Sequence, residues 1–156
     1  MPPVRLDPIY VSFHNDDPRM TPASLVDGSN DTFVLTTGGF PQDIILTVGT
    51  TAAANLTRLR LTLHEAREID VGRCSTALPT SFESVARRTL RRSTDGARQV
   101  EQLDLDPNGA GKGVRYIRVR LLSGYSQFVA MWGVEAEGEE SQQRIAVLES
   151  RPEVVM

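Results

Sequence analysis

Residues that could ligate a metal ion gather around Asp27. The Asp27 carboxylate is accompanied by the hydroxyls of Ser24, Ser29 and Thr32, with backbone carbonyls between them. A hard cation such as Ca²⁺ takes about six to eight oxygen ligands, many of them carbonyls of a tightly bent backbone. A polar β-turn closed by Asx-type hydrogen bonds uses the same residue types, and Asp-Gly is a common turn dipeptide. The residues alone therefore leave both interpretations open.

No other group of residues has the spacing of a catalytic set. The two histidines, His14 and His64, are isolated, and neither lies near a Ser or Cys framed by glycines, as a nucleophilic triad requires. Carboxylates are numerous but scattered, so no acid–base pair stands out. The segment DPNGAGKG (106–113) lacks the spacing of a phosphate-binding loop and predicts a hairpin turn instead. We therefore expect a protein that is not an enzyme.

Composition places the chain among ordinary globular proteins. Its 156 residues suit one domain, with 40% hydrophobic and 24% charged residues. The net charge of -3 argues against a nucleic-acid partner. Cys74 is the single cysteine, so an intrachain disulfide is excluded. The N-terminal MPPVRLDPIY lacks the apolar core of a signal peptide, and no run is long enough for membrane insertion, so we expect a cytoplasmic protein.

Period-two alternation predicts the elements that must position the Asp27 loop. In 56–63, Leu59, Leu61 and Leu63 alternate with polar residues, and 115–122 repeats the pattern. A third alternating run, 127–138, puts Phe128 and Trp132 on its apolar face, so the only tryptophan is expected in the core. Shorter strands are predicted at 9–13, 44–48, 68–71 and 99–105, with turns between them. The pattern predicts an all-β chain, an antiparallel sandwich or barrel.

The segment 82–92 is ambiguous. Its apolar residues fit helical spacing, yet alternate residues could also form one face of an edge strand. Its four arginines make a basic cluster. This cluster is either a solvated face that protects a sheet edge from further pairing, or a binding site for a phosphate or an acidic partner.

Several motifs occur together in a recognisable order. They are Val26-Asp27-Gly28 with Thr32-Phe33, Thr36-Thr37-Gly38, Phe40-Pro41-Gln42, Tyr116-Ile117-Arg118, Ser123, Phe128, Val134 and Ala136-Glu137-Gly138. In this order the chain resembles the intraflagellar transport protein 25 family, within the discoidin or galactose-binding-like superfamily. The resemblance covers roughly residues 5–138. It implies a jelly-roll β-sandwich over residues 1–138, with 139–156 as a C-terminal tail, and makes 82–92 a strand.

The same resemblance implies a structural calcium ion. Family members bind calcium with this loop and an acidic residue of the last strand, which correspond here to Ser24, Asp27, Ser29, Thr32 and Glu137. The two serines stand where relatives often have asparagine, a harmless change if these positions contribute backbone carbonyls.

The resemblance also implies protein partners. These are a Rab-like small GTPase, intraflagellar transport protein 27, and other subunits of the intraflagellar transport B complex, in the cytoplasm and the cilium or flagellum. Outward arginines at 58, 60, 118 and 120 are candidate contacts, or else part of a merely soluble sheet face. The alternative function is a discoidin-type module that recognises a glycan or a lipid headgroup, although aromatic residues suited to stacking are scarce.

Overall fold

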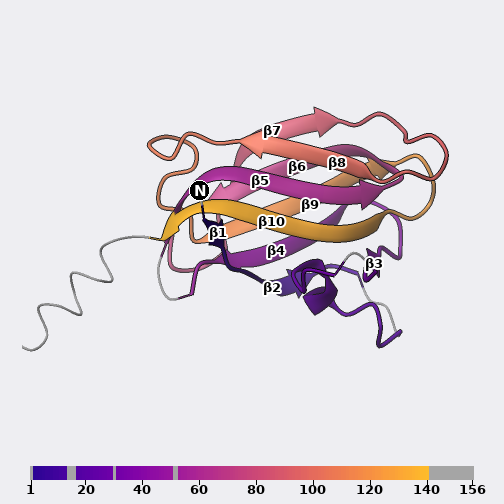
Figure 1. Cartoon of the computed structure of the whole chain (residues 1–156), viewed down its shortest axis with the longest axis horizontal. Coiled ribbons are helices and arrows are strands. Elements are labelled where there is room, and N and C mark those ends of the chain that lie inside the picture. The colour runs from indigo at the N-terminus through magenta and orange to yellow at the C-terminus, as the bar shows by residue number, and fades with distance from the viewer. Residues whose placement is uncertain (1, 14–16, 30, 51–52, 141–156) are drawn as a thin grey trace, which may run out of the picture.

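The computed structural model describes residues 2–13, 17–29, 31–50 and 53–140, which form a sandwich of two antiparallel sheets (Figure 1). The first sheet has the order β1 (Pro3–Val4), β10 (Ala130–Glu140), β5 (Ala54–His64) and β8 (Gln99–Asp104), and β3 (Val34–Leu35) also pairs with β10. The second sheet has the order β2 (Leu6–Val11), β4 (Gln42–Val48), β9 (Tyr116–Gly124), β6 (Ala66–Cys74) and β7 (Glu83–Thr89). The predicted all-β sandwich is confirmed.

The core lies between the two sheets and follows the predicted alternation. Leu59, Leu61 and Leu63 of β5 have no exposed surface, and Ile117, Val119 and Leu121 of β9 are equally buried. Alternate residues of a strand point to opposite faces, so the arginines between these residues point outward. The polar residues therefore cover the sandwich, and the apolar ones hold its sheets together.

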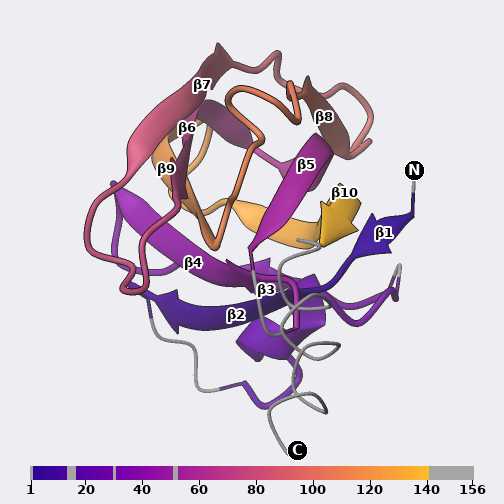
Figure 2. The ribbon, with the colours of Figure 1, turned by 90° about the vertical axis from the view of Figure 1, so that its left-hand side faces the viewer.

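The N-terminal segment belongs to both sheets. Pro3 and Val4 pair with Glu137 and Ala136 of β10. Beyond Arg5, the chain pairs with β4 instead, beginning with Leu6 opposite Val48. Figure 2 shows this segment passing from β10 to β4. One short stretch of chain thus closes one side of the sandwich.

The glutamine of the Thr-Thr-Gly-x-Phe-Pro-Gln motif is a buried structural residue. Gln42 donates hydrogen bonds from Nε2 to the carbonyls of Thr37 (2.7 Å) and Gly39 (2.9 Å), and its Oε1 accepts one from the Ser12 hydroxyl (2.6 Å). A buried amide needs such partners, and here they fix the turn between β3 and β4. The motif therefore has a role in the fold itself.

The predicted burial of Trp132 and Phe128 is wrong. The β10–β5 register shifts between Met131 and Gly133, so that Trp132 is an extra residue in a β-bulge. Met131 occupies the core in its place, and Trp132 is only partly buried. Phe128 precedes the strand and is 43% exposed. A bulge changes the face on which side chains lie, and strict alternation cannot anticipate it.

One further expectation is corrected, and one is confirmed. A short 3-10 helix, η1 (Pro22–Leu25), precedes the Asp27 loop, and proline is tolerated in its first turn. In β8, Gln99 and Leu103 take the buried positions and Val100 is 53% exposed. The segment 106–113 links β8 to β9 in the other sheet and so is not a hairpin turn. The segment 82–92 contains the edge strand β7, as the resemblance implied.

The end of the sandwich lies slightly beyond the expected boundary. β10 continues to Glu140, two residues past 138. The predicted tail from 141 onward and His14 fall outside the described residues. Within the described chain, no helix is long and apolar enough to span a membrane.

The glycine of the Ala-Glu-Gly motif allows β5 and β10 to approach closely, and this generates a prediction. A Cβ at Gly138 would overlap the backbone carbonyl of Asn55 and lie 2.9 Å from Leu56 Cα, and the backbone cannot yield as a flexible side chain would. We expect Gly138→Ala to lower the free energy of unfolding by about 1–3 kcal/mol. In a chain of this length that corresponds to a fall in Tm of about 2–4 °C per kcal/mol, measured by circular dichroism.

Gly133→Ala is the matched control on the same strand. The nearest atom to a Cβ there is the Leu25 carbonyl oxygen at 3.8 Å, an ordinary contact. Its stability should change by less than about 0.5 kcal/mol. Equal effects of the two substitutions would contradict the close approach at Gly138.

Candidate functional site

The Asp27 loop, residues 26–33 without residue 30, is held by hydrogen bonds to the Asp27 carboxylate. Asp27 Oδ1 accepts from the backbone N–H of Ser29 at 2.8 Å, the geometry of an Asx-turn. The Thr32 hydroxyl lies 2.7 Å from Oδ2 and 3.0 Å from Oδ1. Gly28 between them has φ +75°, a conformation that glycine adopts readily. The polar-turn interpretation therefore describes the loop's internal bonding.

These donors favour the ionised form of Asp27. The pKa of its carboxyl is held below its usual range, chiefly by the Ser29 N–H and then by the Thr32 hydroxyl. Both groups donate to the charged carboxylate, which explains the direction of the shift. The loop thus presents a full negative charge near neutral pH.

The structure brings together only part of the predicted calcium set. The Thr32 hydroxyl lies near the Ser24 carbonyl oxygen (3.5 Å) as well as the Asp27 carboxylate, so three kinds of oxygen converge there. The hydroxyls of the two serines are directed elsewhere: Ser24 Oγ donates to the Arg19 carbonyl, and Ser29 Oγ accepts from the Asp31 N–H. The serine side chains are therefore engaged in holding the loop.

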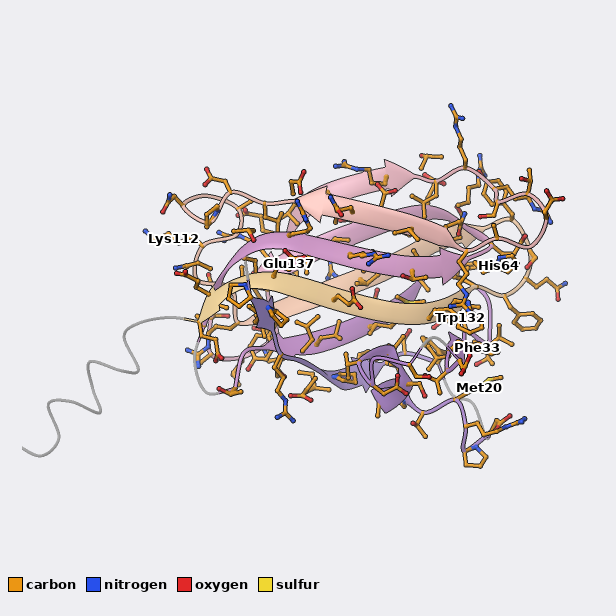
Figure 3. The ribbon with its side chains drawn as sticks, viewed as in Figure 1. Met20, Phe33, His64, Lys112, Trp132 and Glu137 are labelled. Atoms are coloured by element: carbon orange, nitrogen blue, oxygen red, sulfur yellow. The ribbon has the colours of Figure 1, made fainter. Side chains whose placement is uncertain are left out.

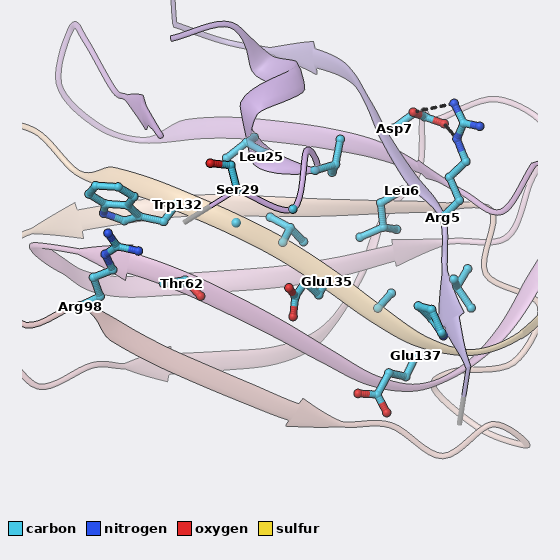
Figure 4. A pocket seen from close by; sticks show the side chains of 17 residues that line it. Arg5, Leu6, Asp7, Leu25, Ser29, Thr62, Arg98, Trp132, Glu135 and Glu137 are labelled. Atoms are coloured by element: carbon cyan, nitrogen blue, oxygen red, sulfur yellow. Dashed lines mark hydrogen bonds and ion pairs between the residues drawn. The ribbon is translucent and has the colours of Figure 1, made fainter. Parts of the chain in front are cut away.

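Glu137 lies away from this loop. It pairs with Pro3 across β10 and β1, and its carboxylate is 3.9 Å from Arg58. Figure 3 places Glu137 toward the opposite end of β10 from Trp132. Figure 4 shows Glu137 and Ser29 well apart from each other. The β10 residues nearest the loop are Trp132, whose ring lies 4.5 Å from that of Phe33, and Gly133 beside the Leu25 carbonyl, and neither is acidic.

Asp27, Thr32 and the Ser24 carbonyl are the predicted ligands that lie together, and they would hold a calcium ion if one binds here. Glu137 lies outside this group. Among the described residues, no three His, Cys, Asp or Glu side chains form a group that could hold a metal. Calcium binding therefore stays a prediction, and a single carboxylate predicts a weak site.

A pocket of about 590 Å³ lies between the Asp27 loop, the N-terminal segment and β10, and we call it the β10 groove. Its floor is formed by buried apolar side chains, those of Val4, Leu6, Leu25 and Val134. Its rim carries Arg5, Asp7, Arg98, Trp132, Glu135 and Glu137 (Figure 4). Such a volume suits a small ligand or a few residues of peptide. Sequence reasoning did not predict this groove, because it depends on the passage of the N-terminal segment between sheets.

Trp132 closes one end of the groove. The guanidinium carbon of Arg98 lies 3.5 Å from the centroid of its ring, a cation–π contact, and the Phe33 ring lies 4.5 Å away at 36°. The Trp-Gly dipeptide was the available signal for this arrangement, because glycine inside a strand often marks a bulge.

The four candidate arginines lie on opposite faces of the sandwich. Arg58 and Arg60 of β5 lie near Glu137 (3.9 Å) and Glu135 (3.7 Å) of β10. On the second sheet, Arg120 binds both Asp43 oxygens at 2.7 and 3.0 Å, and Arg118 stacks over Phe82 at 4.8 Å. One flat partner therefore cannot contact all four.

Comparison with known proteins confirms the resemblance that the motifs indicate. No family model matches the chain. It is 28% identical over 123 residues to intraflagellar transport protein 25 of Chlamydomonas reinhardtii, covering 78% of this chain and 60% of that protein. It is 26% identical to the intraflagellar transport protein 25 homolog of Homo sapiens, covering 80% of this chain and 81% of that protein. The chain thus spans less than two thirds of the algal relative.

Solved structures confirm the fold. CBM32-3 from a family 31 glycoside hydrolase of Clostridium perfringens superposes with a TM-score of 0.68 at 14% identity, covering 86% of this chain and 91% of that one. The family 32 CBM of NanJ from C. perfringens, determined with galactose, gives a TM-score of 0.63 at 14% identity, with 85% and 98% covered. At such identity these likenesses concern the β-sandwich fold alone.

The Asp27 loop generates a calcium prediction. We expect titration calorimetry to detect calcium with a Kd of about 10⁻⁴–10⁻³ M, because the loop supplies one carboxylate. Asp27→Asn should abolish the signal. Glu137→Gln, a matched change of one charge, should leave it unaltered; loss of binding in Glu137→Gln would instead place that residue in the site.

The loop also generates a pH prediction. A carboxyl whose pKa is lower in the folded state contributes stability above its unfolded pKa, and this contribution is lost as the pH falls through the folded pKa. Carboxyl-detected NMR should show Asp27 titrating below its ordinary value of about 3.9. Thr32→Val should raise that pKa, because one donor is removed. No change in Thr32→Val would contradict the role of its hydroxyl.

Proposed function

We propose that this chain is a non-catalytic subunit of the intraflagellar transport B complex and acts in the cilium or flagellum. The similarity to two intraflagellar transport proteins over about four fifths of the chain carries this proposal. The motif residues that carry the resemblance have structural roles here, as Gln42 and Gly138 illustrate. A rigid sandwich with outward polar faces suits an assembly subunit.

The proposed direct partner is a Rab-like small GTPase, intraflagellar transport protein 27. Interface cores are enriched in aromatic residues, and an edge strand offers backbone groups to a partner. β2 is an edge strand, and its residues Ile9 and Tyr10 are 49% and 52% exposed. Among the exposed large apolar side chains of the described chain, these two are adjacent, which favours this edge as the contact.

A glycan-binding role is the second candidate, and the fold likeness to C. perfringens CBM32 domains supports it. Sugar recognition commonly uses an open aromatic face. Trp132 is only partly buried, but the Arg98 guanidinium covers its ring at 3.5 Å. The indole is thus a poor platform for a sugar, and we favour the transport role.

Affinity purification of the tagged chain from ciliated cells tests the proposal. We expect a small GTPase at a one-to-one ratio after a salt wash, with further transport subunits at lower salt. The pair Ile9→Asp and Tyr10→Asp should release the GTPase without unfolding the chain, because both side chains are exposed.

Leu78→Asp is the control, since Leu78 is 67% exposed in the loop between β6 and β7. It should retain the GTPase. Recovery of a lone monomer, combined with binding on a glycan array, would favour the second candidate instead.

A further inference from the structure

Strands pair with both ends of the outer edge of β10, and between them the Leu25 carbonyl of η1 lies near Gly133. β1 pairs with Ala136 and Glu137, and β3 pairs with Ala130 and Met131. In the part of the chain that the structure describes, no strand pairs with residues 132–135 on this side. Four extended residues span about 13 Å. This opening faces the β10 groove, which residues 132–135 line.

The gap follows from the path of the N-terminal segment. After Val4 the chain leaves β10 and continues as β2 on the opposite sheet. Leu6, which would otherwise have continued the ladder toward Val134, pairs with Val48. The edge of the first sheet is therefore interrupted where the N-terminal segment crosses to the second sheet.

The backbone of Val134 points into this opening. The Gly138 N–H donates to the Pro2 carbonyl at 3.1 Å across the same edge, whereas the Glu137 carbonyl accepts from the Thr57 hydroxyl on the β5 side. Backbone groups alternate between the two sides of a strand, so those of Ala136 and Val134 face the same edge as those of Gly138. The Val4–Ala136 pairing agrees with this direction.

The side chains around residues 132–135 determine which residue types would suit a further strand added at this edge, called here a guest strand. A guest residue opposite Val134 would point inward, onto the apolar floor of Leu6 and Leu25. Its two neighbours would point outward, beside Glu135. Glu135 is 66% exposed and its closest cation, Arg60, lies at 3.7 Å, whereas Asp7 is tied to Arg5 at 2.8 Å. The rim also carries Arg5, which is paired with Asp7, and Arg98, which lies over Trp132 at 3.5 Å. Because its contact with Arg60 is the longer one, Glu135 is the rim charge best placed to meet a basic residue of an added strand.

We propose that the β10 groove binds an extended peptide segment of a partner protein, which adds a short strand to β10 between β1 and β3. The segment has an apolar residue opposite Val134 and basic residues on either side. Its backbone bonds to the N–H and C=O of Val134, and its basic side chains contact Glu135 and Glu137. The proposal does not depend on the transport role, because it rests on this chain's own edge.

Two labelled heptapeptides probe the groove of the full chain. Valine alternates with arginine in one and with glutamate in the other. We expect the arginine peptide to bind in fluorescence anisotropy and the glutamate peptide not to bind. Hydrogen exchange should show new amide protection at Val134 on binding.

Three variants test whether the arginine peptide binds in the β10 groove. Glu135→Lys should weaken binding of the arginine peptide by about tenfold or more, as loss of a charge-assisted contact does. Gly133→Leu should abolish it by filling the groove, where a Cβ has room. Glu139→Lys makes the same charge change at an exposed β10 residue outside the groove and should leave binding unaltered.

Several outcomes overturn the proposal. These are failure of the arginine peptide to bind, equal binding of the glutamate peptide, and binding that neither Glu135→Lys nor Gly133→Leu alters. A thermal melt of each variant separates loss of binding from loss of the fold.

Discussion

The ladder between β10 and β5 is the interaction on which the rest of this structure depends. It runs from Ala130 opposite His64 to Glu140 opposite Ala54, and so joins the last strand to the middle of the first sheet. Both N-terminal pairings, by β1 and β3, attach to the other edge of β10. The position of every residue along that edge is therefore set by the β10–β5 register, including the bulge at Trp132.

The same register connects the fold to both candidate sites. Because the bulge turns Trp132 out of the core, it can stack with Arg98 at the end of the β10 groove. Gly133 then faces the Leu25 carbonyl, next to the Asp27 loop. The loop maintains its own shape through the Asp27 carboxylate, whereas the groove exists only because strands from distant parts of the chain meet. The Asp27 loop thus depends on residues close together in the sequence, and the β10 groove depends on tertiary contacts.

The polar residues of the sandwich are of two kinds with different consequences. Buried amides such as Gln42 and Gln99 hold loops between strands, and their hydrogen bonds are protected from water. Surface ion pairs such as Arg58–Asp104 are exposed and contribute little to stability. Surface charges can therefore change with little cost to the fold, and we propose recognition as the role of Glu135 beside the groove.

The sequence by itself determined the all-β class and the buried face of its strands, because alternation of Leu59, Leu61 and Leu63 allows only one buried face. The choice of a sandwich over a barrel came from the family resemblance. It also determined the Asp27 turn, since Asx and glycine geometry is local. The position of Trp132, the distance of Glu137 from the loop and the separation of Arg58 from Arg118 were decided by the tertiary structure. A bulge, a strand that changes sheets and the pairing of distant strands leave no periodic signal in the chain.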